Sequence, residues 1–319
     1  MVHKEISSIN VIPVIILNWN GWDDTSTCVD SVLKSGERCT IWVVDNGSAE
    51  DMSERLLSSY PMIEVIRFDS NFGWSGGYNR ALDIAHKRGH KYAYLLNNDT
   101  KVAPLFLSKT LEFMDEKTAA VGSQILSFDG KYVSFDGKYH DSMPYNLRSG
   151  SETVELINGC GVLVSIEAFN LVGKFDEQYF CYDEETEWSE RAGKICSKVL
   201  KVSFESNVFH LHKGSNINEN TLYYKTRNAF VKTAVRRPYQ PALFDFFHKQ
   251  IQVFRLTHNK EAINAMLCAL QDAFSSKFCV RTTVRAGVGV KIISLLYRFE
   301  FTQPMGFLFY RLSVKLLKS

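Results

Sequence analysis

The chain has 319 residues, of which 45% are hydrophobic and 23% charged, a composition typical of a globular protein and not of a disordered one. Its length suits one large domain or one domain with an appendage. Seven cysteines, without CxxC or Cys/His zinc spacing, argue against a disulfide framework or a structural zinc site and favour a reducing compartment. Residues 1–20 lack the features of a signal peptide, and no run approaches the roughly 18 apolar residues of a transmembrane helix, so we expect a cytoplasmic protein.

The net charge of +2 conceals an uneven distribution along the chain. From Lys225 to the last residue there are 16 Lys and Arg against 4 Asp and Glu, a net charge of +12. The preceding 224 residues hold the other 21 Lys and Arg and the other 31 Asp and Glu, a net charge of −10. An acidic body and a basic tail usually face different partners.

The first hundred residues alternate between short apolar runs and helical segments. The apolar runs are continuous and rich in β-branched residues, which indicates strands covered on both faces: 11–19, 39–46, 63–68 and 92–99. Helices are expected over 24–35 and, after a pair of glycines, over 78–87. This repetition predicts an α/β fold with a doubly wound, mostly parallel sheet, in which ligands bind at the carboxyl ends of the strands.

The pattern is less regular from about residue 120 to 220. Residues 129–141 predict a hairpin or a mobile loop, and residues 157–169 predict a strand that enters a helix. Residues 175–194 contain the start of a strongly acidic helix. After residue 216 the chain becomes basic and helical, which marks a change of character.

Each of the four predicted strands in the first hundred residues ends in polar or small residues. The endings are NWNG with Asn18 and Asn20, DNGS after Asp45, SNFGWSGG, and NNDT. Any one of them is explained as well by a turn, because turns use Asn, Asp and Gly. Four at one edge of a sheet favour a binding site. There Asp45 either accepts a hydrogen bond from a nucleoside or caps the segment that follows.

The run NFGWSGGYNRA, residues 71–81, places three glycines before a predicted helix. Glycine lets the backbone approach a ligand closely, and a helix N-terminus favours phosphate. The run matches neither a Walker loop nor GxGxxG, so taken alone it is a weak signal for a phosphate site.

Asp99 follows Asn97 and Asn98 at the end of the strand predicted over 92–99. It is either a turn residue or a metal ligand. A hard divalent cation that also binds phosphates needs only one or two protein carboxylates, so one Asp at a strand tip suffices. Asn97 occupies the place of a second ligand but is neutral.

The run CYDEETEWSERAG holds five carboxylates between Asp183 and Glu190. Acidic side chains are favoured at a helix N-terminus, so a solvated first turn is one explanation. The other is a cleft wall, because Phe180, Tyr182 and Trp188 interleave with the acids. Crowded carboxylates raise each other's pKa and can supply a general base.

His210 and His212 alternate on a strand-like run and point to one face. They are either a packed or surface pair or ligands of the same cation as Asp99. Arg227 follows two tyrosines in YYKTRN, residues 223–228, and suits either a diphosphate or an ordinary helix start.

Taken in order, these runs resemble family-2 glycosyltransferases of the GT-A fold, above all a bacterial rhamnosyltransferase-like branch that builds cell-surface polysaccharide. The resemblance covers about residues 11–230 and rests on the ordered set VIILNWNG, VVDNGS, NFGWSGGYNRA, LLNNDT, NGCGVLV, FDEQYFCYDEETEW, VFHLHKGS and YYKTRN. It implies a nucleotide-sugar donor, a divalent cation (Mg²⁺ or Mn²⁺) and inversion at the anomeric carbon. It implies a Rossmann-like GT-A domain over 1–230, with a mostly parallel central sheet flanked by helices, which leaves the basic helical region over 231–319 as a C-terminal extension.

The resemblance also assigns the reacting groups. Asp99 is implied to bind the metal, as the second acid of a D-x-D motif whose first Asp is replaced by Asn97. Glu185 is implied to be the catalytic base, with Glu184 as the next candidate because Asp is more usual at this position. Glu185 would take the proton of an acceptor hydroxyl as it attacks the anomeric carbon.

Further roles follow from the resemblance. His210 matches an H-x-x-x-x-S spacing with Ser215 and is an implied metal ligand. His212 is close enough to His210 in the sequence to remain a second candidate ligand. Asp45 is implied to contact the nucleoside, and Arg227 to lie near the diphosphate. The other residues expected to bind the donor are Asn18, Asn20, Asn71, Gly76, Gly77, Asn79, Asn97 and Asn98.

The basic tail lies outside the resemblance. Residues 305–319 set Arg311, Lys315 and Lys318 on one helical face among apolar residues. Together with residues 288–299 they suit a helix lying on an anionic bilayer, at the inner face of the cell membrane, where lipid-linked acceptors reside. A dimerising or domain-packing helix is the alternative. A nucleic-acid partner is disfavoured because the acidic body would repel a phosphate backbone.

The function expected is therefore inverting transfer of a sugar from a nucleotide-sugar to an acceptor hydroxyl in cell-surface polysaccharide or glycan synthesis. The resemblance favours dTDP-rhamnose, although galactose and glucose donors use similar motifs. A nucleotide-sugar-binding pseudoenzyme that scaffolds an assembly complex is the alternative, and Glu185 speaks against it. A nucleotidyltransferase would carry a basic, glycine-rich loop after the first strand, where this chain has the acidic NWNGWDD.

Overall fold

The computed structural model describes residues 11–128, 132–134, 139–141, 148–211, 219–234 and 260–274. The chain divides into two units. Unit 1 consists of the residues up to Glu177 and Glu184–Lys213, and unit 2 of Gln178–Asp183 and the chain from Gly214 onward. Helix α7 (Glu219–Ala234), which spans the domain boundary expected at residue 230, groups with unit 2.

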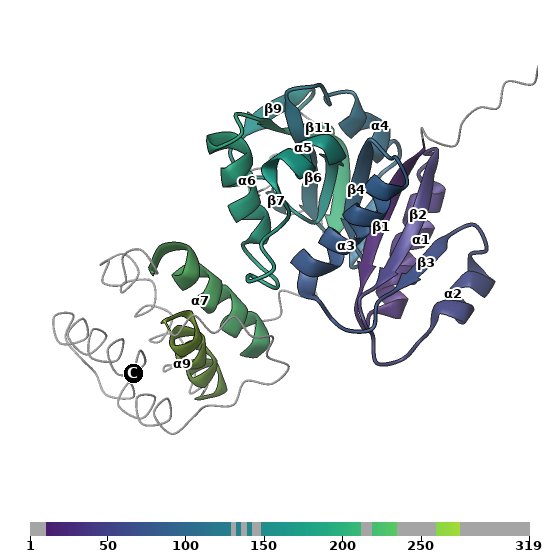
Figure 1. The fold of residues 1–319 in the computed structure, drawn as a ribbon. Coiled ribbons are helices and arrows are strands. Elements are labelled where there is room, and N and C mark those ends of the chain that lie inside the picture. Colours follow the sequence, from purple (N-terminus) through teal and green to yellow (C-terminus); the bar gives the residue numbers. More distant parts are fainter. Residues whose placement is uncertain are drawn as a thin grey trace, which may run out of the picture. The chain divides into compact units, whose positions relative to one another are not determined.

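Unit 1 is built on one mixed sheet with the strand order β3-β2-β1-β4-β10-β6-β11-β5 (Figure 1). The bounds are β1 Ile12–Asn18, β2 Cys39–Asp45, β3 Glu64–Arg67, β4 Tyr92–Asn97, β5 Thr100–Val102, β6 Thr118–Ser127, β10 Gly161–Ser165 and β11 Val199–His210. β3, β2, β1 and β4 are parallel, as predicted. β10 runs antiparallel to β4 and β6, and β11 is parallel to β6. The carboxyl ends of β1 to β4, β6 and β11 therefore share one edge of the sheet.

Three short strands complete the sheet. β7 (Tyr132–Ser134) and β8 (Tyr139–Asp141) pair antiparallel with each other, and β7 pairs with β6. The hairpin expected over residues 129–141 is thereby confirmed. β9 (Ser151–Val154) lies antiparallel to β11.

Four of the six helices described in unit 1 were predicted, and the two short ones after β2 and β5 were not. Their bounds are α1 Trp22–Lys34, α2 Ser53–Ser59, α3 Gly73–Lys87, α4 Phe106–Leu111, α5 Ile166–Val172 and α6 Glu184–Lys194. The strand that enters a helix is confirmed as β10 and α5. One prediction was wrong: α3 begins at Gly73, so Gly76 and Gly77 lie inside the helix and not before it.

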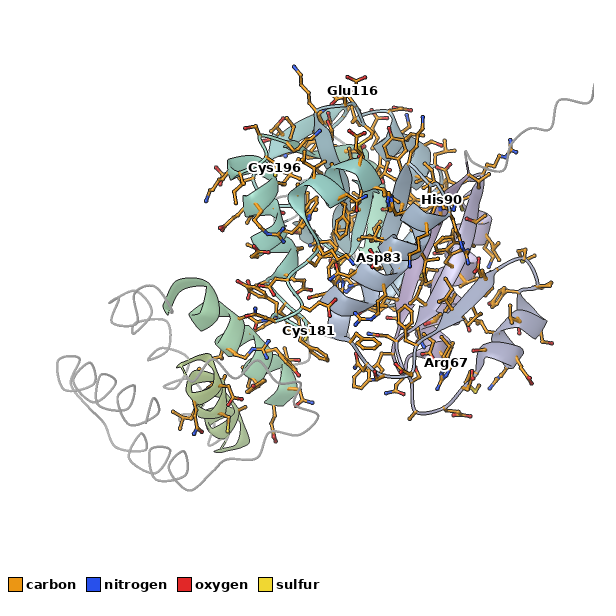
Figure 2. The ribbon with its side chains drawn as sticks, in the orientation of Figure 1. Arg67, Asp83, His90, Glu116, Cys181 and Cys196 are labelled. Carbon is orange, nitrogen blue, oxygen red and sulfur yellow. The ribbon has the colours of Figure 1, made fainter. Side chains whose placement is uncertain are left out.

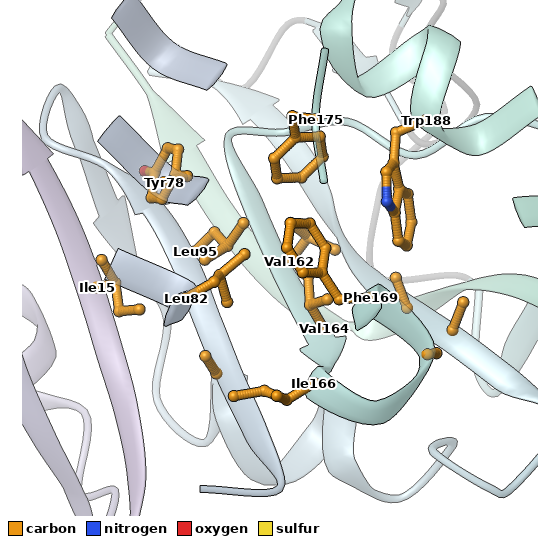
Figure 3. Close-up of a cluster of buried hydrophobic side chains, with 14 of the residues drawn as sticks. Ile15, Tyr78, Leu82, Leu95, Val162, Val164, Ile166, Phe169, Phe175 and Trp188 are labelled. Atoms are coloured by element: carbon orange, nitrogen blue, oxygen red, sulfur yellow. The ribbon is translucent and has the colours of Figure 1, made fainter. Parts of the chain in front are cut away.

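The core explains why the strands are continuously apolar. Successive strand residues point to opposite faces of the sheet. One face carries a buried cluster from the strands, α3, α5 and α6, shown in Figure 3: Ile15, Tyr78, Leu82, Leu95, Val162, Val164, Ile166, Phe169, Phe175 and Trp188. The other face carries a second cluster with α1 and α4: Val14, Ile16, Val29, Val32, Val43, Leu96 and Phe106. Because helices cover both faces of the sheet, the residues of the central strands are apolar on both sides.

In unit 2, α7 packs against α9 (Lys260–Phe274). The Tyr223 hydroxyl of α7 donates a 2.5 Å hydrogen bond to the Asp272 carboxylate of α9, and both residues are buried. None of the helices in the described part of the chain is long and apolar enough to cross a membrane. The basic segments 288–299 and 305–319, predicted to contact a membrane or a second copy, lie outside the described residues.

Candidate active site

Asn18, the last residue of β1, organises the carboxyl edge of the sheet. Its Nδ2 donates to Asp45 Oδ1 (3.1 Å) and to Ser48 Oγ (3.2 Å). Its Oδ1 accepts from the Gly21 amide (3.1 Å) and the Thr25 hydroxyl (2.9 Å). Asn18 is fully buried. The amide thus joins β1, β2 and α1 at this edge, and its predicted contact with a donor stays a prediction.

Asp45, which ends β2, is fully buried and paired with protein groups. Oδ1 accepts from Asn18 and from the backbone and hydroxyl of Ser48. Oδ2 forms an ion pair with Arg67 at the end of β3, a residue labelled in Figure 2. Arg67 Nη2 also donates to the Ser48 carbonyl at 2.8 Å. A ligand arriving here meets the partly exposed Arg67 guanidinium, so a direct bond from Asp45 to a nucleoside remains a prediction.

Trp19 and Asn20 follow Asn18 on the solvent side of the same edge. Asn20 has a left-handed backbone (φ 55°) and is held by the Ala49 amide, which donates to its Oδ1 at 2.9 Å. Trp19 is 54% exposed, unusual for an indole. We did not select Trp19 from the sequence, although an aromatic residue between two amides at a strand end was a usable signal.

The loop between β3 and α3 is fixed by two asparagines. Asn46 Nδ2 donates to Asn71 Oδ1 (3.0 Å) and to the Gly73 carbonyl (2.9 Å), and its Oδ1 accepts from the Phe72 amide (3.1 Å). Gly47 must be glycine, because its φ is +74° and a Cβ would lie 2.4 Å from the Ser70 carbonyl carbon. The predicted residue Asn71 is therefore at the edge, in a rigid loop.

Three other residues predicted to bind the donor serve packing in this structure. A Cβ on Gly76 would lie 2.7 Å from Phe72 Cβ, and one on Gly77 would lie 2.7 Å from Leu17 Cδ1. Asn79 is buried and donates to the Phe175 carbonyl (2.9 Å) while accepting from its amide (3.0 Å). Gly77 lets α3 lie close to β1, and the role of all three residues toward a donor stays a prediction.

The amides before Asp99 are both engaged with the protein. Asn97 Oδ1 accepts from Trp74 Nε1 (3.1 Å), and Asn97 Nδ2 contacts Cys160 Sγ (3.4 Å). Asn98 Nδ2 donates to the Gly21 carbonyl (3.2 Å) and the Thr25 hydroxyl (3.1 Å). Asn97 therefore holds Trp74 in place, and the predicted contacts of Asn97 and Asn98 with a donor stay predictions.

Asp99 and His210 lie together at the tip of the sheet, although 111 positions separate them in the sequence. The His210 imidazole Nε2 lies 3.2 Å from the Asp99 carboxylate. The pairing of β11 with β5, which places His210 opposite Thr100, brings them together. The side chain of His210 keeps 12% of its surface exposed, and that of Asp99 keeps 14%. His212 lies outside the described residues.

This pair fits a divalent cation that is also bound by phosphate. One carboxylate and one imidazole are suitable ligands, and such a cation takes its remaining ligands from phosphate and water. The described residues hold no group of three or more His, Cys, Asp and Glu side chains placed to bind a metal by themselves. Burial disfavours the imidazolium, but the adjacent Cys160 and Asp99 outweigh it and raise the pKa of His210 to about 10.

The raised pKa of His210 predicts a pH-dependent contribution to stability. Because the folded-state pKa lies above the unfolded value near 6.5, this stability is fully present below pH ~6.5 and is lost as pH rises through about 10. In metal-free buffer, His210→Gln should lower the urea midpoint more at pH 6 than at pH 10. His90→Gln is the control, because burial lowers the pKa of His90 and keeps it neutral over the alkaline range. An equal deficit of His210→Gln at both pH values would contradict the ion pair.

The acidic segment places three carboxylates in the first turn of α6: Glu184, Glu185 and Glu187. Glu184 is 3% exposed, and Glu185 is half-buried. Glu187 is held by Arg191, whose Nε and Nη2 lie 2.6 Å and 2.8 Å from its carboxylate. Glu185 is therefore more exposed than Glu184, and the role of either as the base stays a prediction; Glu187 is paired with Arg191 within the helix.

Arg227 belongs to unit 2 and is fully buried. Its Nη2 donates to the carbonyls of Gln178 (2.6 Å) and Tyr179 (2.7 Å), which belong to the same unit. The guanidinium is thus engaged by backbone carbonyls, and the predicted contact with a diphosphate stays a prediction.

Residues 14–171 match the family described as glycosyl transferase family 2. The chain is also similar to the N-acetylglucosaminyl-diphospho-decaprenol L-rhamnosyltransferase of Mycobacterium tuberculosis, found in two strains. The identity is 23%, and the match covers 58% of this chain and 71% of each relative.

Solved structures with the same fold include GalNAc-T7 with UDP, GalNAc and Mn²⁺, at a TM-score of 0.56 and 18% identity. That match covers 74% of this chain and 52% of the other, so this chain spans about half the length of that protein. S. aureus TarS 1–349, solved also with UDP-GlcNAc, matches at a TM-score of 0.53 and 14% identity over 96% of this chain and 90% of the other. At these identities the structures establish the fold, which is that of GT-A glycosyltransferases.

Proposed function

Residues 14–171 of this chain form a family-2 glycosyltransferase domain of the GT-A fold, and on that premise we propose that the protein transfers a sugar from a nucleotide-sugar to an acceptor hydroxyl with inversion at the anomeric carbon. The observation that carries the proposal is the Asp99–His210 pair at the carboxyl edge of the sheet. In an open α/β sheet this edge is where ligands bind. Rhamnose from dTDP-rhamnose is the proposed donor group, because the mycobacterial relative is named a rhamnosyltransferase.

The donor nucleoside is proposed to lie over the ends of β1 and β2. Trp19 presents an exposed indole there, on which a base can stack, and Arg67 offers a cation fixed by Asp45. The buried side chain of Asn18 donates to Asp45, the partner of Arg67, and that of Asn46 donates to Asn71 in the neighbouring loop. Asp45 then contributes by orienting Arg67 as well as through any bond to the nucleoside.

Replacing Trp19 with alanine is expected to weaken nucleoside diphosphate binding about tenfold, because stacking a base on an aromatic ring contributes roughly 1–3 kcal/mol. Titration calorimetry with dTDP and UDP measures this. Met62→Ala is the matched control, because Met62 is 64% exposed at the amino end of β3, on the opposite edge. Equal affinities for wild type and Trp19→Ala would remove Trp19 from the donor site.

The diphosphate is proposed to lie at the tip of β4, with a divalent cation held by Asp99 and His210. When bound, the cation neutralises the charge that develops on the leaving nucleoside diphosphate. To ligate the cation, the imidazole must be neutral, so binding releases the proton that Asp99 otherwise stabilises on His210. Asn97 fixes the geometry of the site by holding Trp74.

Glu185 is the proposed general base. It is the second residue of α6, after a half-buried turn, and a carboxylate there can take the proton of an acceptor hydroxyl while the sugar is attacked from the face opposite the leaving group. Glu184 is the second candidate and is nearly buried.

The acceptor is proposed to be a glycan linked to a lipid, since the mycobacterial relative is named for a decaprenyl diphosphate acceptor. On this proposal the protein takes part in cell-surface glycan synthesis. The sequence of the basic tail, outside the described residues, suits a membrane surface where such acceptors lie.

The proposal is tested by product analysis. The protein is incubated with dTDP-rhamnose, Mg²⁺ or Mn²⁺ and an N-acetylglucosaminyl diphospho-polyprenol acceptor, and the lipid product is examined by mass spectrometry and proton NMR. The expected product is heavier by one deoxyhexose and has the anomeric configuration opposite to the donor. Retained configuration would contradict inversion. Donor binding without any product would favour the nucleotide-sugar-binding scaffold.

A further inference from the structure

The segment Gln178–Asp183, which leads directly into α6, has an unusual backbone. Phe180, Tyr182 and Asp183 adopt left-handed φ angles of 63°, 69° and 68°. Residues with a side chain rarely adopt this region, because the Cβ crowds the backbone, and three such residues among four positions need support from their surroundings. None of the three is glycine, so the conformation must be held by contacts.

Those contacts come from two buried side chains of α7. Asn228 Nδ2 donates to the carbonyls of Tyr179 (3.0 Å), Cys181 (2.8 Å) and Tyr182 (2.7 Å). Arg227 Nη2 donates to the carbonyls of Gln178 and Tyr179. Asn228 is 1% and Arg227 0% exposed. Two neighbouring residues thus engage four of the six carbonyls of the segment.

Arg227 also orients Asn228. Its Nε donates to Asn228 Oδ1 at 3.0 Å, which turns the Asn228 amide nitrogen toward the segment. Ring contacts reinforce the arrangement: Phe180 stacks on Tyr224 at 4.9 Å between centroids, and Lys225 lies 4.9 Å from the Tyr182 ring. The bond from Tyr223 to Asp272 fixes α7 itself to α9. Asn228 and Arg227, which together we call the clamp, are therefore held in place within unit 2.

We infer that Asn228, oriented by Arg227, is a positioning residue for the general base. Asp183 is followed at once by Glu184 and Glu185, the first residues of α6, so the clamp holds the stretch of backbone that leads directly into the helix that carries both base candidates. The inference rests on the proposed function, because it needs Glu185 or Glu184 to act as the base. On this inference the permanently charged guanidinium of Arg227 binds the backbone of this segment and not a diphosphate.

The test is Asn228→Asp in the full chain. This change is nearly isosteric, removes both N–H donors and sets a carboxylate against three carbonyls. We expect kcat for transfer to fall about 10²-fold, as a misplacement of about 1 Å in a reacting group can cause, while the Kd for nucleoside diphosphate, measured by calorimetry, changes less than about twofold. Rates are taken per binding site found by calorimetry, so loss of folded protein does not imitate the effect. Asn220→Asp, an exposed residue of α7, is the matched control and should behave as wild type.

Arg227→Lys is the second variant, because it keeps the charge and loses the bond from Nε to Asn228. Arg227→Lys should likewise lower kcat while it leaves the Kd for nucleoside diphosphate nearly unchanged, and this can be measured even if Asn228→Asp does not fold. A wild-type kcat in either variant would overturn the inference, and so would a Kd that rises in proportion to the loss of rate. If wild type binds nucleoside diphosphate but turns over no donor, the proposed function fails and not the clamp. The clamp is then judged by whether Asn228→Asp lowers protection of the 178–185 amides from hydrogen exchange.

Discussion

Glu185→Gln is expected to lower the rate of sugar transfer by ~10²–10⁴-fold, the usual contribution of a general base. Glutamine keeps the shape of the side chain but cannot accept the proton of the acceptor hydroxyl. Donor binding should be retained, because the nucleoside and diphosphate are proposed to lie on the sheet edge and not on α6. The measurement pairs kcat for transfer with the Kd for nucleoside diphosphate.

Two further glutamates of α6 provide the comparison. Glu190→Gln makes the same chemical change in a side chain that lies near Lys194 (3.9 Å), and it should leave the rate close to that of wild type. Glu184→Gln separates the two base candidates. Full activity of Glu185→Gln together with loss of activity in Glu184→Gln would move the base by one residue.

Asp99→Asn should abolish the dependence of turnover on divalent cation and lower the rate by about 10²-fold or more. A bound cation contributes several kcal/mol of charge stabilisation in a transition state, and each 1.36 kcal/mol is a factor of ten in rate. Asparagine preserves the turn after β4 but removes the only carboxylate of the Asp99–His210 pair. Mn²⁺ binding followed by electron paramagnetic resonance, in the presence of nucleoside diphosphate, gives a readout independent of activity.

The control is Asp30→Asn, on the exposed side of α1, where Asp30 lies 3.8 Å from Lys34. It removes the same charge away from the proposed site and should change neither Mn²⁺ binding nor rate. Unchanged metal dependence in Asp99→Asn would show that the cation, if required, is held elsewhere. A fall in rate with undiminished Mn²⁺ binding would limit Asp99 to orienting His210.

The parts of the fold that depend on local pattern were predictable from the sequence. Continuous apolar strands indicated a sheet covered on both faces, and the two core clusters have that arrangement. Polar strand endings predicted that Asn18, Asp45 and Asp99 would share one edge, because carboxyl ends of parallel strands coincide. The antiparallel insertion of β10 was not predictable, since it depends on pairing between distant segments.

The proximity of His210 to Asp99 was predicted only as one of two alternatives, because it depends on β11 returning beside β5. The partner of Asp45 could not be predicted. Arg67 ends a short strand without a distinctive motif, yet the register of β2 and β3 sets it opposite Asp45. A glycine in a sequence is equally consistent with a ligand-binding loop and with close packing of two elements. Gly77 serves packing, because it lies against Leu17.

The central claim is most directly tested by measuring nucleoside diphosphate release from a panel of nucleotide-sugars that includes dTDP-rhamnose. Purified full-length protein is assayed with Mn²⁺ or with a chelator, with and without the lipid-linked acceptor, beside Asp99→Asn and Glu185→Gln. The account predicts release from one preferred donor that requires the cation, is accelerated by the acceptor and is lost in both variants. Release that persists with the chelator and in both variants would contradict it.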